Sequence, residues 1–157
     1  MPSRKSPLFP DGDFLLPLGP GEVLRGVGFK RAGRNFVRNR GGTVDGVYFR
    51  TSTFGAWTFQ VIASVFHRGH HERVSGRPFP SNPFPGRAIP LAQTEVLCLL
   101  QDGSKSPWWQ IRFGVEIGPI AEALAFALRD TLPFFESWSD EAVKARLLSL
   151  GAGHGGS

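Results

Sequence analysis

Apolar and polar positions alternate along several stretches of the chain, and this period of two predicts β-strands. Residues 35–40 and 43–50 flank Gly41-Gly42, a pair that favours the tight turn of a hairpin. In the register set by this turn, Arg38 lies opposite Asp45 and forms a cross-strand ion pair. Apolar side chains fall on both faces of this hairpin, so the sequence leaves open which face meets the core.

Three further segments continue the strand pattern. Residues 57–67 show the clearest alternation and predict a strand with one buried face. Residues 94–101 are apolar on both faces, which predicts a central strand of the sheet. A turn at Asp102-Gly103 and renewed alternation over 108–115 predict a second hairpin.

The last third of the chain changes to helical spacing. Leucines one turn apart predict a helix over 119–131, which we expect Pro133 to end. A second helix is predicted over 139–150, with a serine as N-cap and Gly151 just beyond its last turn. Near the other end, residues 20–27 predict a short helix.

These elements predict an α+β fold, because strands come first and helices last. We expect an antiparallel sheet of four or five strands with the two C-terminal helices on one face. The domain spans residues 14–150, between flexible ends at 1–13 and 151–157. The side chains expected to be buried are Val61, Leu97, Leu99, Ile111, Phe113, Leu124, Leu128 and Leu147.

The connection over residues 68–93 is long and rich in proline. It contains the sequence Phe-Pro twice, at Phe79 and Phe84, each preceded by another proline. Loops of this length are usually functional or disordered, and Phe-Pro units favour an extended segment laid over an apolar groove. The groove belongs either to this domain or to a partner. We favour a groove of the domain itself, because Phe79 and Phe84 need an apolar surface to cover them, and we keep both as candidate binding residues.

Composition narrows the class of protein. The chain has 157 residues, of which 41% are apolar, enough for one folded domain without disulfides. The single cysteine, Cys98, lies in an apolar segment, which favours a buried thiol over a nucleophile. No apolar run approaches the roughly 18 residues of a membrane helix. We therefore expect a cytoplasmic protein that does not enter a membrane.

Positive charge is concentrated in the first part of the chain. The net charge is +5, and residues 1–92 hold 13 Lys and Arg against 5 Asp and Glu. Arg34 and Arg38 are the candidate contacts for a nucleic acid. A composition that is rich in arginine throughout, with no role in nucleic-acid binding, explains the same excess of positive charge. We expect at most weak, non-specific nucleic-acid binding, with a Kd on the order of 10⁻⁵ M.

His67, His70 and His71 form the one histidine cluster of the sequence. Neutral imidazoles are good zinc ligands, so this cluster is the candidate centre of a metal-dependent enzyme. Its spacing differs from the helical zinc motif, in which two histidines stand four residues apart with a glutamate beside the first. We expect the histidines to bind no metal, and we expect no cofactor.

Four segments, in this order, resemble one protein family. They are the basic stretch Leu24–Arg38, the strand Trp57–Val65, the pair Trp108-Trp109 and the Leu132–Phe135 step. Together they are similar to the family called domain of unknown function 4304. The resemblance implies an α+β fold and a bacterial source. It brings no activity, cofactor or catalytic residue.

The sequence thus favours a small binding domain without catalytic activity, and the expected partner is another protein. A nucleic-acid-binding domain is the first alternative, supported by the arginines. A metal-dependent enzyme at the histidine cluster is the second. Whether the domain acts as a monomer or a homodimer stays open.

Overall fold

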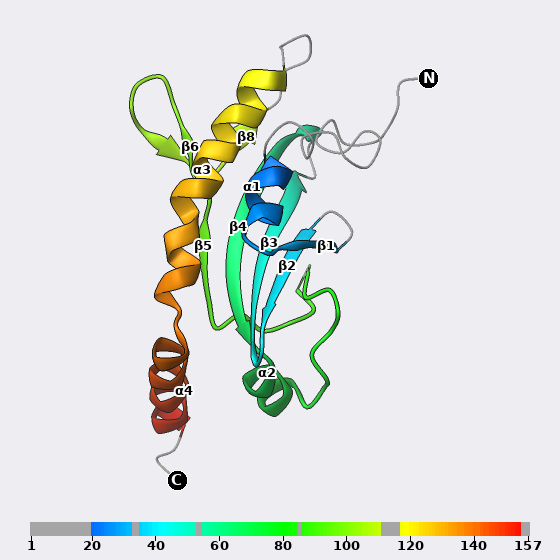
Figure 1. Cartoon of the computed structure of the whole chain (residues 1–157), viewed down its shortest axis with the longest axis vertical. Helices are drawn as coiled ribbons and strands as arrows, with labels where there is room; N and C mark the ends of the chain where they lie inside the picture. The colour runs from blue at the N-terminus through cyan, green and yellow to red at the C-terminus, as the bar shows by residue number, and fades with distance from the viewer. Residues whose placement is uncertain (1–19, 33–34, 53–54, 85, 111–116, 155–157) are drawn as a thin grey trace.

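The structure is a computed structural model that describes residues 20–32, 35–52, 55–84, 86–110 and 117–154 (Figure 1). In chain order its elements are α1 (Pro20–Gly26), β1 (Lys30–Ala32), β2 (Asn35–Arg40), β3 (Thr43–Ser52), β4 (Gly55–His67), α2 (Arg68–Ser75), β5 (Ala92–Glu95), β6 (Cys98–Leu99), β7 (Lys105–Ser106), β8 (Trp109–Gln110), α3 (Ile117–Ser137) and α4 (Asp140–His154). The predicted α+β class is confirmed. The arm over residues 1–13 and the last three residues lie outside the described part of the chain.

One antiparallel sheet forms the centre of the domain. Its strands run in the order β1-β2-β3-β4-β5. The short β8 pairs with β4 near its N-terminal end, at Thr58 and Phe59. The predicted hairpin is confirmed in its register, with Arg38 opposite Asp45 across β2 and β3. Gly41 occupies the turn with a φ of 69°, a conformation that favours glycine. β3 and β4 form the longest pairing and carry most of the sheet.

Helices α1 and α3 lie side by side on one face of the sheet (Figure 1). The sequence left open which face of the β2–β3 hairpin meets the core. In the structure it is the face that carries Phe36, Val47 and Phe49. Val61 of β4 and the α3 residues Leu124 and Leu128 are buried with them, as predicted. Ile111 and Phe113 lie outside the described residues.

The predicted end of the first C-terminal helix at Pro133 is wrong. Helix α3 continues through Pro133 to Ser137. Pro133 is exposed, so the carbonyl group that loses its intrahelical partner can face water instead. The following helix also runs past its predicted end, because Gly151 lies inside α4, which continues to His154. Leu147 of α4 is only half-buried.

The prediction of a central strand over 94–101 is also wrong. The chain leaves the sheet after β5, and Cys98–Leu99 pairs instead with Lys105–Ser106 in a separate hairpin. Leu97 and Leu99 are therefore 40% and 66% exposed rather than buried. A segment that is apolar on both faces either lies within a sheet or forms an apolar surface. Leu97 and Leu99 belong to an apolar surface.

The other face of the sheet is covered by the proline-rich segment. Its first eight residues form helix α2, which the sequence analysis assigned to a loop. His67 caps this helix with its ring nitrogen, a role for which serine, threonine, asparagine or aspartate is the usual signal. Phe84 then packs on Phe66 and Val44 in a second apolar cluster, so this segment covers the domain's own sheet.

None of the helices among the described residues is long and apolar enough to cross a membrane.

Candidate functional site

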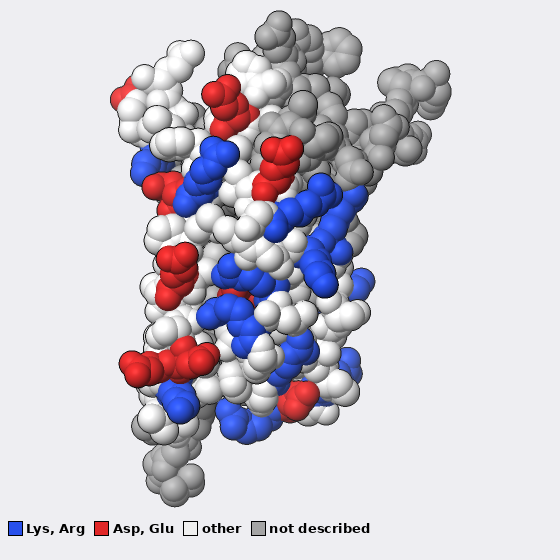
Figure 2. Space-filling model, in the orientation of Figure 1, with Lys and Arg blue, Asp and Glu red and all other residues white. Residues whose placement is uncertain are grey.

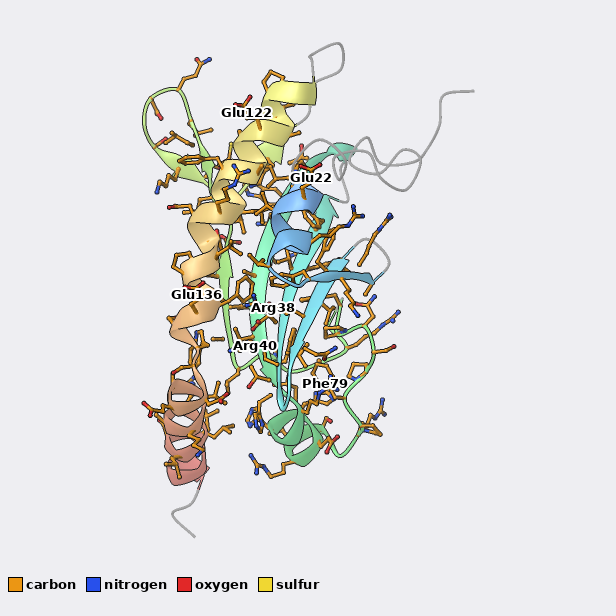
Figure 3. The ribbon with its side chains drawn as sticks, viewed as in Figure 1. Glu22, Arg38, Arg40, Phe79, Glu122 and Glu136 are labelled. Carbon is orange, nitrogen blue, oxygen red and sulfur yellow. The ribbon has the colours of Figure 1, made fainter. Side chains whose placement is uncertain are left out.

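Two arginines of β2 converge on one carboxylate beneath the C-terminal end of α3. Asp45 is completely buried, with 0% exposure. Arg38 Nε donates to its Oδ2 over 2.8 Å, while Arg40 Nε and Nη2 donate to Oδ2 and Oδ1 over 2.7 and 2.8 Å. The remaining Nη1 groups of these arginines donate to two backbone carbonyls, those of Val27 and Trp138. Figure 3 shows Arg38 and Arg40 next to each other.

This network joins three parts of the fold. The Arg38 guanidinium also lies over the rings of Phe29 and Phe135, at 4.7 and 5.7 Å from their centroids. The hairpin, the end of α1 and the end of α3 are thereby linked. Arg38 is thus engaged by Asp45, as the register predicted, and Arg40 is engaged as well. Arg34, the other candidate phosphate contact, lies outside the described residues.

Charged side chains divide the visible surface of the domain into two sides. Lys and Arg gather over α1, β1 and β2, whereas Asp and Glu predominate along α3 and α4 (Figure 2). Arg25 and Lys30 are exposed on the basic side, and Glu136 on the acidic side. The basic side is the surface on which an anionic partner would bind.

Each histidine of the predicted cluster has a structural contact. His67 Nδ1 accepts from the His70 backbone N–H over 3.1 Å at the start of α2. The buried His71 accepts from the Ile89 N–H through Nδ1, also over 3.1 Å, and so ties α2 to the proline-rich segment. Among the described residues, no group of three or more His, Cys, Asp or Glu side chains is arranged to hold a metal ion.

The pKa of His67 is lowered, first by burial and second by the positive charge of Arg73. A lowered pKa means that the unfolded chain binds a proton more readily than the folded one. The stability from this neutral imidazole is present above the usual histidine pKa and is lost as the pH falls through and below it. The N-cap bond needs the same neutral form, because a protonated Nδ1 cannot accept.

We expect His67→Asn to reduce the loss of stability on acidification, because asparagine keeps the N-cap acceptor and does not titrate. Urea unfolding at a series of pH values between about 5 and 8 measures this effect against the wild-type chain. His70→Asn is the control for the loss of a neighbouring imidazole. Equal pH dependence of wild type and His67→Asn would contradict the assignment.

The two phenylalanines of the proline-rich segment pack against their own domain. Phe84 is buried, and its ring stacks on Tyr48 with centroids 5.2 Å apart. Phe79 contacts Phe66, and the Arg68 guanidinium lies over the Phe79 ring, with its Cζ 5.0 Å from the ring centroid. Phe79 retains partial exposure and Phe84 has almost none. In the structure, the two candidate binding residues hold the proline-rich segment in place on its own domain.

Cys98 is half-buried on β6, at the hairpin that leaves the sheet. Burial raises the pKa of its thiol, which disfavours the thiolate form. A catalytic cysteine requires the opposite shift. The local environment therefore favours a structural role for this side chain.

The sequence analysis missed one concave surface of the described residues. It is a groove of about 590 Å³ between α3 and the β6–β7 hairpin, here called the hairpin groove. Leu97 and Leu99 form its strand side, and Phe126, which is 70% exposed, projects from α3 on its helix side. Trp109 closes the bottom, where its indole N–H donates to the Val96 carbonyl over 2.9 Å.

Charged groups surround this apolar centre. Glu95 contributes a carboxylate from the sheet side, and Glu122 and Asp130 contribute carboxylates from α3. Lys105 and Arg129 are the two cations of the lining. An apolar floor with a polar, mainly acidic edge has the organisation of a protein-binding surface. The apolar run around Leu97 and Leu99 was the available signal in the sequence, but such a run indicates either a buried strand or an apolar surface.

Comparisons with known proteins place the chain in a family without assigning an activity. The family model described as a domain of unknown function, number 4304, matches residues 21–137. Searches of curated proteins and of solved structures found no match. The matched range extends from α1 to the end of α3 and includes the whole sheet, Asp45 and the hairpin groove. The chain therefore belongs to the domain of unknown function 4304 family.

Proposed function

We propose that this chain is a protein-binding domain and that its partner binds in the hairpin groove. The observation that carries the proposal is the exposure of Leu99 and Phe126, at 66% and 70%, on opposite sides of one concave surface. Large apolar side chains that gather around a groove mark interaction sites more often than isolated ones do. Burial of both side chains by a partner would remove apolar surface from water, which favours association.

The charge around the groove indicates the chemistry of the partner. Three carboxylates and two cations line it, so a segment with apolar side chains and at least one Lys or Arg is complementary. Carboxylates on both the sheet side and the α3 side allow such a basic residue to pair while apolar residues cover Leu99 and Phe126. We therefore infer a peptide segment of another protein as the occupant.

Nucleic-acid binding is the second candidate, supported by the basic side seen in Figure 2. Arg38 and Arg40 already use their donors on Asp45 and on backbone carbonyls. Fewer arginines are then available to contact phosphates, and phosphate contacts supply most of the affinity in non-specific binding. This arrangement supports the protein partner over a nucleic acid.

A random peptide library displayed on phage and selected on the wild-type domain tests the proposal. We expect the enriched peptides to contain two apolar side chains and a Lys or Arg. Leu99→Ser and Phe126→Ser should each weaken a selected peptide by about tenfold or more, because each removes a central apolar contact. Leu148→Ser is the matched control, since Leu148 is 75% exposed on α4 and lies outside the groove lining.

Two results would contradict the proposal. The first is a set of selected peptides whose affinity changes equally in all three variants. The second is a wild-type dimer in light scattering that Phe126→Ser converts to a monomer, which would make a second copy of this chain the occupant. Circular dichroism of each variant checks that the fold is retained.

A further inference from the structure

We propose that a second cavity, on the face of the sheet opposite α3, binds a small aromatic carboxylate. This cavity, here called the Ser64 cavity, has a volume of about 380 Å³. Its floor is the outer face of β3 and β4, and its wall is the proline-rich segment around Phe84. The proposal is independent of the hairpin groove, which lies on the side of α3.

A buried hydroxyl at one end of the floor points to a ligand. Ser64 is only 1% exposed, and its Oγ has no hydrogen-bond partner among the described residues. Native proteins rarely leave such a group unpaired, because the lost hydration is costly. A ligand with a hydroxyl or another hydrogen-bonding group at this end would satisfy it.

A cation stands at the other end of the same floor. Among the residues that the structure describes, the exposed Arg50 guanidinium has no hydrogen-bond or ion-pair partner, and it lines the cavity. A guanidinium matches a carboxylate with two parallel N–H donors. Arg50 therefore gives the cavity its preference for an anion.

The strand register sets the length of the ligand. Gly46 pairs with Ser64 and Arg50 pairs with Gln60, so Arg50 and Ser64 stand four residues apart along the two strands. At about 3.3 Å per residue, their backbones are about 13 Å apart. The long Arg50 side chain covers part of this distance. One six-membered ring with polar groups at both ends fits the remainder.

The walls between these ends are apolar and flat. Tyr48 and Phe84 stack with an interplanar angle of 8°, Phe66 lies edge-on to Phe84, and Pro83 and Pro90 belong to the same lining. An aromatic ring packs well against such surfaces. A volume near 380 Å³ lies at the small end of the range for ligand sites. The ligand class is thus an aromatic acid with a polar group opposite its carboxylate.

Such chemistry occurs both in a free acid and at a peptide C-terminus that ends in tyrosine. Titration calorimetry on the full chain with 4-hydroxyphenylacetate and with N-acetyl-Gly-Tyr distinguishes these two sources. We expect at least one probe to bind with a Kd on the order of 1 mM or tighter. The corresponding amides, which lack the carboxylate, should bind at least about tenfold more weakly.

Variants then locate the site. Arg50→Gln should weaken the binding of the acid at least about tenfold, and Ser64→Ala should weaken the hydroxylated probe more than phenylacetate. Arg87→Gln removes the same charge from an exposed position outside the cavity lining and should leave the Kd unchanged. Equal binding of acid and amide, an unchanged Kd in Arg50→Gln, or no saturable binding up to about 10 mM of either probe would overturn the proposal.

Chemical shifts provide a check that does not depend on the variants. The backbone amides of Ser64 and Gln93, which face each other across β4 and β5, should move on titration with the bound probe. Shifts confined to α3 and the β6–β7 hairpin would place the probe in the hairpin groove and would equally overturn the proposal. Phe126→Ser, the variant that tests the proposed function, should not change the Kd of the aromatic acid.

Discussion

Asp45→Asn is expected to destabilise the domain by about 3–5 kcal/mol, the usual result when one partner of a buried ion pair is removed. The variant keeps the size of the side chain and removes its charge. Arg38 and Arg40 then hold two positive charges close together with no carboxylate to neutralise them. For a chain of this length the loss lowers the Tm by about 6–20 °C, which differential scanning calorimetry measures.

Asp130→Asn is the matched control, since Asp130 is exposed on α3 and its replacement should change stability by less than about 0.5 kcal/mol. A variant with Arg38→Met, Arg40→Met and Asp45→Leu should recover part of the loss, because no charge is then left without a partner. Wild-type stability of Asp45→Asn would show that the network contributes nothing to the fold.

Phe84→Ala is expected to cost about 3–5 kcal/mol, because it empties a buried aromatic position. Phe84 lies directly over Gly46, where a Cβ atom would come within 2.5 Å of the Phe84 ring. Gly46→Ala should therefore also destabilise, by about 1–3 kcal/mol through overpacking. Both values follow from urea unfolding of the purified variants.

The two substitutions should not be additive. In the Phe84→Ala background the ring is gone, so adding Gly46→Ala should cost much less than it does in the wild-type chain. Phe126→Ala is the control for the loss of a phenylalanine, because that side chain is exposed and its removal should change stability little. Additive effects of Gly46→Ala and Phe84→Ala would contradict the packing of this ring on the strand.

The sequence predicted those elements whose signals are local. Gly41-Gly42 set the hairpin and its register, and the spacing of Leu124 and Leu128 identified the face of α3 that meets the sheet. The family was also evident from the order of its segments. The hairpin depends on one turn between two strands, and the buried face of α3 depends on neighbours within one or two helical turns.

Other features depend on contacts that the local pattern does not contain. The segment 94–101 reads the same whether its leucines enter a sheet or line a groove beside α3. Helix α2 has a histidine as N-cap and a glycine in its first turn, so the usual starting signals are missing. A proline ends a helix where the carbonyl group that it leaves unpaired would be buried. Pro133 is exposed, and this exposure depends on how α3 packs.

The candidate sites were hidden for the same reason. The Ser64 cavity joins residues of β3, β4, β5 and the proline-rich segment, and only the pairing of strands brings Arg50 and Ser64 onto one floor. The hairpin groove needs the packing of α3 beside β6 and β7. The three histidines formed a candidate metal site in the sequence because they lie close together in it, yet the ring nitrogens of His67 and His71 cap α2 and hold it against the proline-rich segment.

The bond between Arg40 and the Trp138 carbonyl has a consequence for the order of folding. It joins residues 98 positions apart, whereas the Arg40–Asp45 bonds close a loop of only five positions. Closing a longer loop costs more chain entropy, so the short hairpin can form well before the helix arrives. We therefore expect Asp45 to orient Arg40 in advance, and α3 to dock later onto a donor that is already in place.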